Sequence, residues 1–221
     1  GSNRQPAGIA DQTNTLHFSR KGTINLVTGE TSLEDWTAQD GTSFAALENP
    51  VKKGYVVVAE ESTDTTSSDL TKVGEHTGIH ADAADITDTV IYRPVGAYRI
   101  SYATGKEPAH AQKEIPYLND PTNPTAIASP TAILPYVEGL EPKDARGQVL
   151  NLVDPLDETK GYLLPSPDSP TADTAITYAI SKGSVRVRFL IEGSDTDMQE
   201  AQDLATEVDF GTKYTSEAPT E

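Results

Sequence analysis

The sequence of 221 residues is long enough for one or two domains, and its hydrophobic content of 36% is lean for one large core but sufficient for small β modules. Its formal net charge of −17, from 34 acidic and 17 basic residues, argues against nucleic acid as a partner, because phosphate binding requires clustered Lys and Arg. The acidity also argues against attachment to anionic lipid, and no apolar run in the sequence approaches the roughly 20 residues of a membrane span, so direct membrane insertion is not expected. The absence of cysteine excludes disulfides and thiolate zinc sites.

The N-terminal part of the chain is predicted to hold short strands joined by turns. Residues 1–14 are polar and expected to be loose, and their Gly-Ser start is typical of a tag remnant, so we expect the sequence to be a fragment of a longer protein. A strand is predicted at 15–19. A hairpin is predicted at Thr28-Gly29-Glu30, because glycine takes a positive φ without steric cost, with residues 33–36 on the return strand.

Three longer strands are predicted between residues 55 and 102. Tyr55–Ala59 is an apolar, β-branched run, and residues 86–92 and 97–102 alternate between two faces. The intervening stretch 60–85 is rich in Ser, Thr, Asp and Glu, and is predicted to be a long loop or insertion. Residues 104–114 have the composition of a linker, which makes this segment the candidate domain boundary.

The second half of the chain is dense in proline. Ten prolines lie from Pro116 to Pro170, so helices longer than one turn are not expected there. From residue 184 a short amphipathic strand is predicted, since Val185, Val187 and Phe189 alternate with arginines. Residues 194–206 fit either one helix or an acidic hairpin tip, after which a strand is predicted to pair back.

No catalytic residue is predicted. The sequence contains neither a Gly-x-Ser-x-Gly elbow nor a Gly-rich phosphate loop, so we expect the chain not to be an enzyme. His76 and His80 are four residues apart and could bind zinc from one side of a helix, but Gly78 and the Ser/Thr-rich surroundings favour a surface loop.

A few residue types could bind a ligand. Asp195 and Asp197 place carboxylates at alternating positions, which can suit calcium; the alternative is a solvated turn, and no cofactor is required. Trp36 could stack on a sugar ring, although a lone Trp in a small β module is more often part of the core. Tyr98 and Tyr102 are candidate ligand-binding residues, but they also alternate like a packed face.

A set of short motifs follows in order along the first half. They are Phe18-Ser19-Arg20, Val27-Thr28-Gly29-Glu30-Thr31, Asp35-Trp36-Thr37, Ser43-Phe44-Ala45-Ala46, Pro50 to Tyr55, and Val90-Ile91-Tyr92. Their order and spacing resemble the B2 module of the mucus-binding (Mub) repeats of lactic-acid bacteria. Such modules begin with an earlier strand, which little before Thr15 could supply, so we hypothesise that the strand Val185–Ile191 fills that edge in cis or from a neighbouring molecule.

Motifs in the second half resemble the segment that follows B2 in the same proteins. They are Tyr92 to Gly96, Pro116 to Thr125, Pro135 to Gly139, Val153-Asp154-Pro155, Lys160-Gly161-Tyr162 and Thr174 to Tyr178. The predicted domains are therefore a loose N-terminus at 1–14, a B2-like β module at 15–103 and a Pro/Asp-rich β module at 104–180. Residues 181–221 are either the start of a further β-grasp-like unit or a strand pair that completes the fold.

The predicted fold class is mainly β, an elongated tandem of small β-grasp-like modules with turn-rich connections. The resemblance implies a non-enzymatic adhesin fragment that binds mucin glycans or glycoproteins of host mucus, with immunoglobulin as a further candidate partner. It also implies an extracellular location, with the parent protein anchored to a Gram-positive cell wall and neighbouring repeats acting together. The alternative function is a structural stalk with no ligand of its own.

Overall fold

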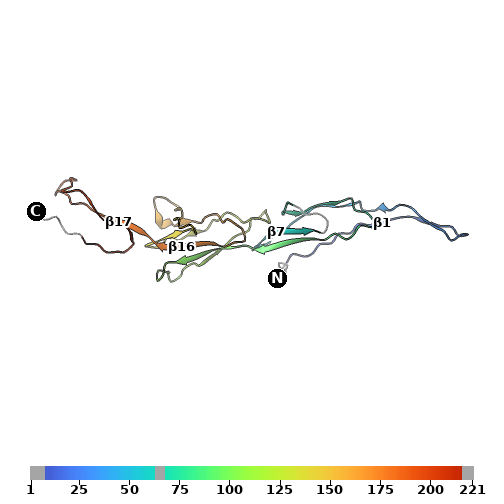
Figure 1. Cartoon of the computed structure of the whole chain (residues 1–221), viewed down its shortest axis with the longest axis horizontal. Coiled ribbons are helices and arrows are strands. Elements are labelled where there is room, and N and C mark those ends of the chain that lie inside the picture. The colour runs from blue at the N-terminus through green and yellow to red at the C-terminus, as the bar shows by residue number, and fades with distance from the viewer. Residues whose placement is uncertain (1–7, 63–67, 216–221) are drawn as a thin grey trace. The chain divides into compact units, whose positions relative to one another are not determined.

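Strands and turns make up nearly all of the regular structure in the computed structural model, which describes residues 8–62 and 68–215 (Figure 1). Within those residues the one helix is a 3-10 turn, η1 (Glu158–Lys160), and no helix is long and apolar enough to cross a membrane. The chain divides into two units, Gly1–Val95 with Tyr117–Ser129, and Gly96–Pro116 with Pro130–Glu221. The prediction of a mainly β chain built from small modules is confirmed.

Unit 1 consists of antiparallel strand pairs. β1 pairs with β4, β2 with β3, β5 with β9, β6 with β8, and β7 with β10. The strands are β1 (Phe18–Ser19), β2 (Gly22–Ile24), β3 (Thr31–Leu33), β4 (Thr37–Ala38), β5 (Ser43–Phe44), β6 (Leu47–Glu48), β7 (Tyr55–Ser62), β8 (Lys72–Val73), β9 (His76–Thr77) and β10 (Asp88–Pro94).

The core of unit 1 lies along β7. The side chains of Val56 and Val57 are buried, as the apolar β-branched run predicts. The segment Tyr117–Ser129 lies against the start of this strand. The Val57 amide donates to the carbonyl of Pro124 (2.9 Å), and the Asn119 side chain accepts from the Gly54 amide (2.6 Å) and donates to the Tyr55 carbonyl (2.5 Å).

The stretch predicted to be a long loop is more ordered than expected. β7 continues to Ser62, and β8 and β9 return as short strands that pair with β6 and β5. The loop prediction is therefore wrong for these parts, because the pairing partners lie more than 20 residues away and leave no local periodicity. Residues 63–67 of the predicted loop lie outside the described residues.

Unit 2 is built on a four-stranded sheet in the order β12-β11-β16-β14. The strands are β11 (Ala97–Tyr102), β12 (Glu114–Pro116), β14 (Leu140–Lys143) and β16 (Thr174–Ile180), with a separate pair formed by β13 (Ile133–Leu134) and β15 (Tyr162–Leu163). The central strands β11 and β16 are parallel, and the outer pairings are antiparallel. This strand order fits a β-grasp sheet, whereas the helix of a β-grasp fold has no counterpart in the described part of unit 2.

The position of β11 differs from the predicted domain boundary. We predicted this strand to close the first module, at residue 103. Its hydrogen-bonded partners are β12 and β16, both of which belong to unit 2. Conversely, Tyr117–Ser129 was predicted in the second module and belongs to unit 1.

The core of unit 2 contains stacked tyrosines. Tyr178 of β16 is fully buried, its ring stacks on Tyr102 of β11 with centroids 4.9 Å apart, and its hydroxyl donates to the carbonyl of Pro135 (2.6 Å). Leu134 is also fully buried, and Gly161 lies so close to it that an added Cβ would overlap the Leu134 carbonyl oxygen. The hydrogen bond from Tyr178 to Pro135 joins the β13–β15 pair to the sheet, and the approach of Gly161 to Leu134 packs the pair together.

The last part of unit 2 is a hairpin of β17 (Lys182–Val187) and β18 (Gln202–Asp209). The helix alternative for residues 194–206 is wrong and the hairpin is present, but its return strand begins at Gln202, within the predicted tip. The ring of Phe210 lies against Gly139, and the Ser181 amide donates to the Gly139 carbonyl (2.9 Å). Because β17 pairs with β18, the described residues do not use it to complete the first module in cis; completion from a neighbouring molecule stays a prediction.

Candidate ligand-binding surface

Residues 17–40 of unit 1 form one long two-stranded ribbon, called here the 17–40 ribbon, which carries the label β1 in Figure 1. Its two ladders join Phe18 to Ala38 and Gly22 to Leu33, and continue toward the tip. Between Ser19 and Gly22 lie two residues, whereas three lie between Leu33 and Thr37, so the return strand contains a β-bulge. The ribbon is thus continuous from its base to its turn.

The tip of the ribbon is fixed by Asn25. Its carbonyl accepts from the Gly29 amide (2.7 Å), and its side-chain oxygen accepts from the amides of Val27 (2.9 Å) and Thr28 (3.3 Å). Gly29 has a φ of 76°, which confirms the predicted hairpin and the expectation that its glycine takes a positive φ. Leu26 and Val27 at the turn are 91% and 95% exposed.

The two faces of the ribbon differ in chemistry. Side chains alternate between the faces of a strand, and directly paired residues share a face. One face, called here the apolar face, therefore carries Phe18, Ile24, Leu33 and Trp36, with Arg20 among them. The opposite face carries only polar side chains, such as Ser19, Thr23, Ser32 and Thr37.

The apolar face is open in the described structure. Ile24 is 59% exposed, Leu33 52% and Trp36 50%. The core alternative for Trp36 is therefore wrong, because no second sheet among the described residues packs on the ribbon to bury the ring. A row of large apolar side chains left in water on a surface ribbon is typical of an interaction site.

Arg20 lies over the ring of Trp36, with its guanidinium carbon 4.4 Å from the ring centroid. Among the described residues no carboxylate forms an ion pair with Arg20. Arg99 contrasts with it, since Arg99 binds Asp173 (2.8 Å) and Glu114. Stacking holds the guanidinium in place and leaves its edge N–H groups open to a ligand.

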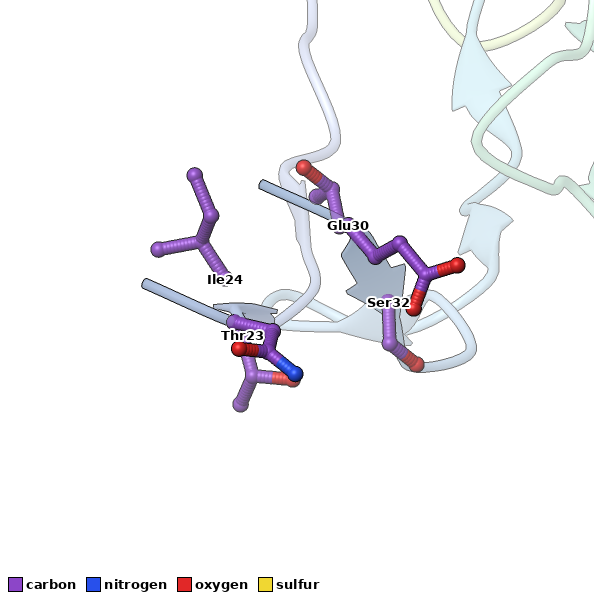
Figure 2. A pocket seen from close by; sticks show the side chains of 6 residues that line it. Thr23, Ile24, Glu30 and Ser32 are labelled. Carbon is purple, nitrogen blue, oxygen red and sulfur yellow. The ribbon is translucent and has the colours of Figure 1, made fainter. Parts of the chain in front are cut away.

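A shallow hollow lies between the tip and the middle of the ribbon (Figure 2). Figure 2 shows the side chains of Thr23 and Ile24 leaving the strand on opposite sides, with Glu30 and Ser32 on the neighbouring strand. Residues of the two strands line this hollow, namely Thr23, Ile24, Asn25, Glu30, Thr31 and Ser32. Thr23, Ser32 and Glu30 place hydroxyls and a carboxylate on the polar side of this hollow, and such groups suit a ligand rich in hydroxyl groups.

A hydrogen-bonded pair of His17 and Asp40 lies at the base of the ribbon. His17 Nδ1 is 2.5 Å from an Asp40 carboxylate oxygen, and the His17 amide donates to the same oxygen (3.0 Å). These hydrogen bonds, the side-chain one first, lower the pKa of Asp40 below its usual value.

The tyrosines predicted as ligand-binding candidates lie in the packed part of unit 2. Tyr98 is 2% exposed, and its hydroxyl donates to the carbonyl of Pro165 (2.6 Å). Tyr102 stacks on Tyr178 and donates to the carbonyl of Gln112 (3.2 Å). The structure therefore favours the packed-face alternative, and alternation alone could not distinguish it from an exposed face.

The predicted calcium residues lie in the loop between β17 and β18. The Asp197 carboxylate is engaged by Arg188, with N–O distances of 2.9 and 3.2 Å. Asp195 contributes its carbonyl oxygen to the same guanidinium (3.4 Å). In the described residues no group of three or more His, Asp or Glu side chains is placed to hold a metal, so calcium binding at Asp195 and Asp197 stays a prediction.

His76 is not on a surface loop. It is 5% exposed on β9, and its Nε2 lies 2.8 Å from an Asp88 carboxylate oxygen. Glu60 lies on the same face as Asp88, because it pairs with Val90, two residues along β10. The surface-loop prediction is wrong for His76, since the pairing of β9 with β5 brings it inside; we call Glu60, His76 and Asp88 the buried acid–histidine cluster.

The 17–40 ribbon lies in the part of the chain that matches a known family. Residues 1–96 match the family model of the Muc B2-like domain, so this part of the chain is a B2 module of the mucus-binding type, as its motifs predict. The family is a binding domain of extracellular surface proteins and not an enzyme family. The chain matches no curated protein and no solved structure.

Proposed function

We propose that this chain is an adhesin fragment that binds mucin glycoproteins of host mucus through the apolar face of the 17–40 ribbon. The observation that carries the proposal is the uncovered row of Ile24, Leu33 and Trp36 within the B2 module. The C–H face of a sugar ring can pack on Trp36 and Leu33. Its hydroxyl groups can exchange hydrogen bonds with the hydroxyl of Thr31, which pairs with Ile24 and therefore lies on the apolar face.

A ribbon of this kind offers a weak single site. Little of a ligand is enclosed by one open face, so affinity must come from repetition, in a parent protein that carries neighbouring repeats on a bacterial cell wall. Linked sites raise avidity by about 10²–10⁴ without any new contact. Immunoglobulin is the second partner to test, because a protein surface can also cover an apolar ribbon face.

The test uses beads that carry many copies of the chain, applied to a mucin-coated surface. A double variant, Leu33→Ser with Trp36→Ala, removes the centre of the apolar face. We expect it to lower bead retention at least tenfold, whereas Leu156→Ser should retain wild-type binding, since it removes an almost fully exposed Leu from unit 2. An immunoglobulin-coated surface is run in parallel.

The outcomes separate the candidate functions. Wild-type beads that bind neither mucin nor immunoglobulin would favour the stalk. Beads whose retention is the same for the double variant and the wild type would place the ligand surface elsewhere. Matching thermal melts of the variants are required, and they are expected because both changed residues are half exposed.

A further inference from the structure

We propose that Arg20 and Trp36 form a subsite for an anionic pyranoside, meaning a sugar ring that carries a carboxylate or a sulfate ester. This proposal rests on the proposed function and specifies which saccharides the apolar face prefers. The geometric basis is the guanidinium of Arg20 stacked 4.4 Å from the Trp36 ring centroid, on a face that stays open.

The charge of Arg20 is available to an anionic ligand. A guanidinium has a planar set of N–H donors that matches a carboxylate or a sulfate. Stacking on an aromatic ring fixes the orientation of the guanidinium and leaves these N–H donors available for hydrogen bonds. Three other arginines of this chain already have carboxylate partners: Arg99 with Asp173, Arg186 with Asp203, and Arg188 with Asp197. In the described structure Arg20 has an aromatic partner and no acidic one.

Selectivity for an anionic ligand depends on local positive charge, because the protein as a whole is acidic. With a net charge of −17, the chain as a whole repels anions, so an anionic ligand needs a local cation. Lys21 follows Arg20 in the strand and lies on the opposite face of the ribbon, where it adds to the positive charge around the subsite. The Debye length of about 8 Å at physiological salt screens carboxylates elsewhere in the molecule.

The surface around the guanidinium is apolar and open. Trp36 is 50% exposed, and Leu33 on the same face is 52% exposed. Leu33 lies over Gly22, where an added Cβ would meet its Cδ2 at 2.9 Å, so the side chain lies flat on the ribbon. A sugar ring can rest on these apolar groups while its anionic group reaches the Arg20 edge, which a peptide carboxylate without the ring could not reproduce.

The test uses the intrinsic fluorescence of Trp36, which is the one Trp of the chain. The full chain is titrated with sialyllactose and with galactose 6-sulfate, and with lactose and galactose as uncharged matches. We expect saturable changes in emission with one or both charged sugars, at least tenfold tighter than with the uncharged ones. The comparison of the carboxylate and sulfate sugars identifies the source of the charge.

Variants then link the response to Arg20. Arg20→Gln should abolish saturable binding, and Arg20→Lys should weaken it several-fold, because it keeps the charge but loses the planar set of donors and the stacking. Arg93→Gln, which removes an exposed arginine on β10, is the charge-matched control and should titrate like wild type. Equal response to charged and uncharged sugars, a strictly linear response, or an unchanged Arg20→Gln titration would each overturn the proposal.

A second experiment separates this inference from the proposed function. Wild-type beads are applied to native mucin and to mucin stripped of sialic acid and sulfate. Equal retention on both surfaces would refute the anionic subsite and leave mucin binding intact. A saturable Trp36 response to sialyllactose without any retention on mucin would refute the proposed function and leave the subsite standing.

Discussion

Among single residues, the buried acid–histidine cluster has the strongest consequence for stability. Glu60 is 7% exposed, and one of its carboxylate oxygens and one of Asp88 are buried without a hydrogen-bond partner among the described residues. Burial raises the pKa of Glu60, and the negative charge of Asp88 raises it further, while His76 opposes the shift. The folded state therefore holds the Glu60 proton more tightly than the unfolded chain does.

The cluster predicts a stability that falls as pH rises. Because the pKa of Glu60 is raised on folding, its contribution is fully present below the unfolded value and is lost as pH rises through the folded one. Glu60→Gln removes this loss and supplies N–H donors to the partnerless oxygen of Asp88. We expect a gain of about 1 kcal/mol at pH 7 and a flatter dependence of Tm on pH between 4 and 7.

Thermal melts across that pH range check the prediction. Glu61→Gln is the matched control, since Glu61 is the exposed neighbour on the same strand. Curves for Glu60→Gln and wild type that run parallel would contradict the prediction.

Residue-level chemistry was the part least accessible to sequence reasoning. The types of Trp36, His76 and Tyr98 were known, but exposure depends on what packs over each side chain. His76 is buried by a strand 32 residues earlier, and Trp36 is exposed because no second layer in the described part of the chain covers its ribbon. One sequence signal could have revealed the apolar face. Phe18, Arg20 and Ile24 occupy alternate positions of the strand that enters the predicted hairpin, so their side chains share one face.

Among the elements, the close approach of Gly161 to Leu134 gives a direct test of how β13 and β15 pack. Gly161 has a φ of 89°, and a Cβ there would overlap the Leu134 carbonyl. Gly161→Ala should therefore cost at least about 2 kcal/mol, from backbone strain together with displacement of a fully buried residue.

Denaturant unfolding, with a matched glycine as control, isolates the contribution of packing to this loss of stability. Gly147 has a φ of 80° and open space around it, so Gly147→Ala carries the backbone strain alone, about 1 kcal/mol. If the two variants unfold at the same denaturant midpoint, the close contact does not matter.

Elements with their own periodicity were predictable. The hairpin at Gly29 and the strands near residues 55, 90 and 100 have turn glycines or alternating side chains, and all are present. β8 and β9 were missed because two-residue strands depend on partners that lie far away in the sequence. The choice between helix and hairpin for residues 194–206 was likewise decided by the ladder from β17 to β18.

At the scale of the whole molecule, neither of the two units is one continuous piece of sequence. Unit 1 requires Asn119, which binds the backbone of Gly54 and Tyr55. Asn119→Ala should lower the stability of unit 1 by about 2–3 kcal/mol, because two hydrogen bonds to part-buried backbone groups are lost.

Hydrogen exchange of the Gly54 amide, together with denaturant unfolding, measures this loss. Asn151→Ala, which truncates an exposed asparagine of unit 2, should leave both unchanged. Unchanged protection of Gly54 in Asn119→Ala would show that unit 1 is complete without the segment Tyr117–Ser129.

This order of segments also determines when each unit can fold during synthesis. A chain made from its N-terminus cannot finish unit 1 until residue 129 is available, and β11 must wait for β16, whose paired residues come about 75 positions later. Sheets that rely on such distant partners form slowly, and their unpaired strands remain exposed in the meantime. During synthesis each unit therefore stays incomplete until its last segment has been added, residue 129 for unit 1 and β16 for the sheet of unit 2, and its early strands remain without partners over that interval.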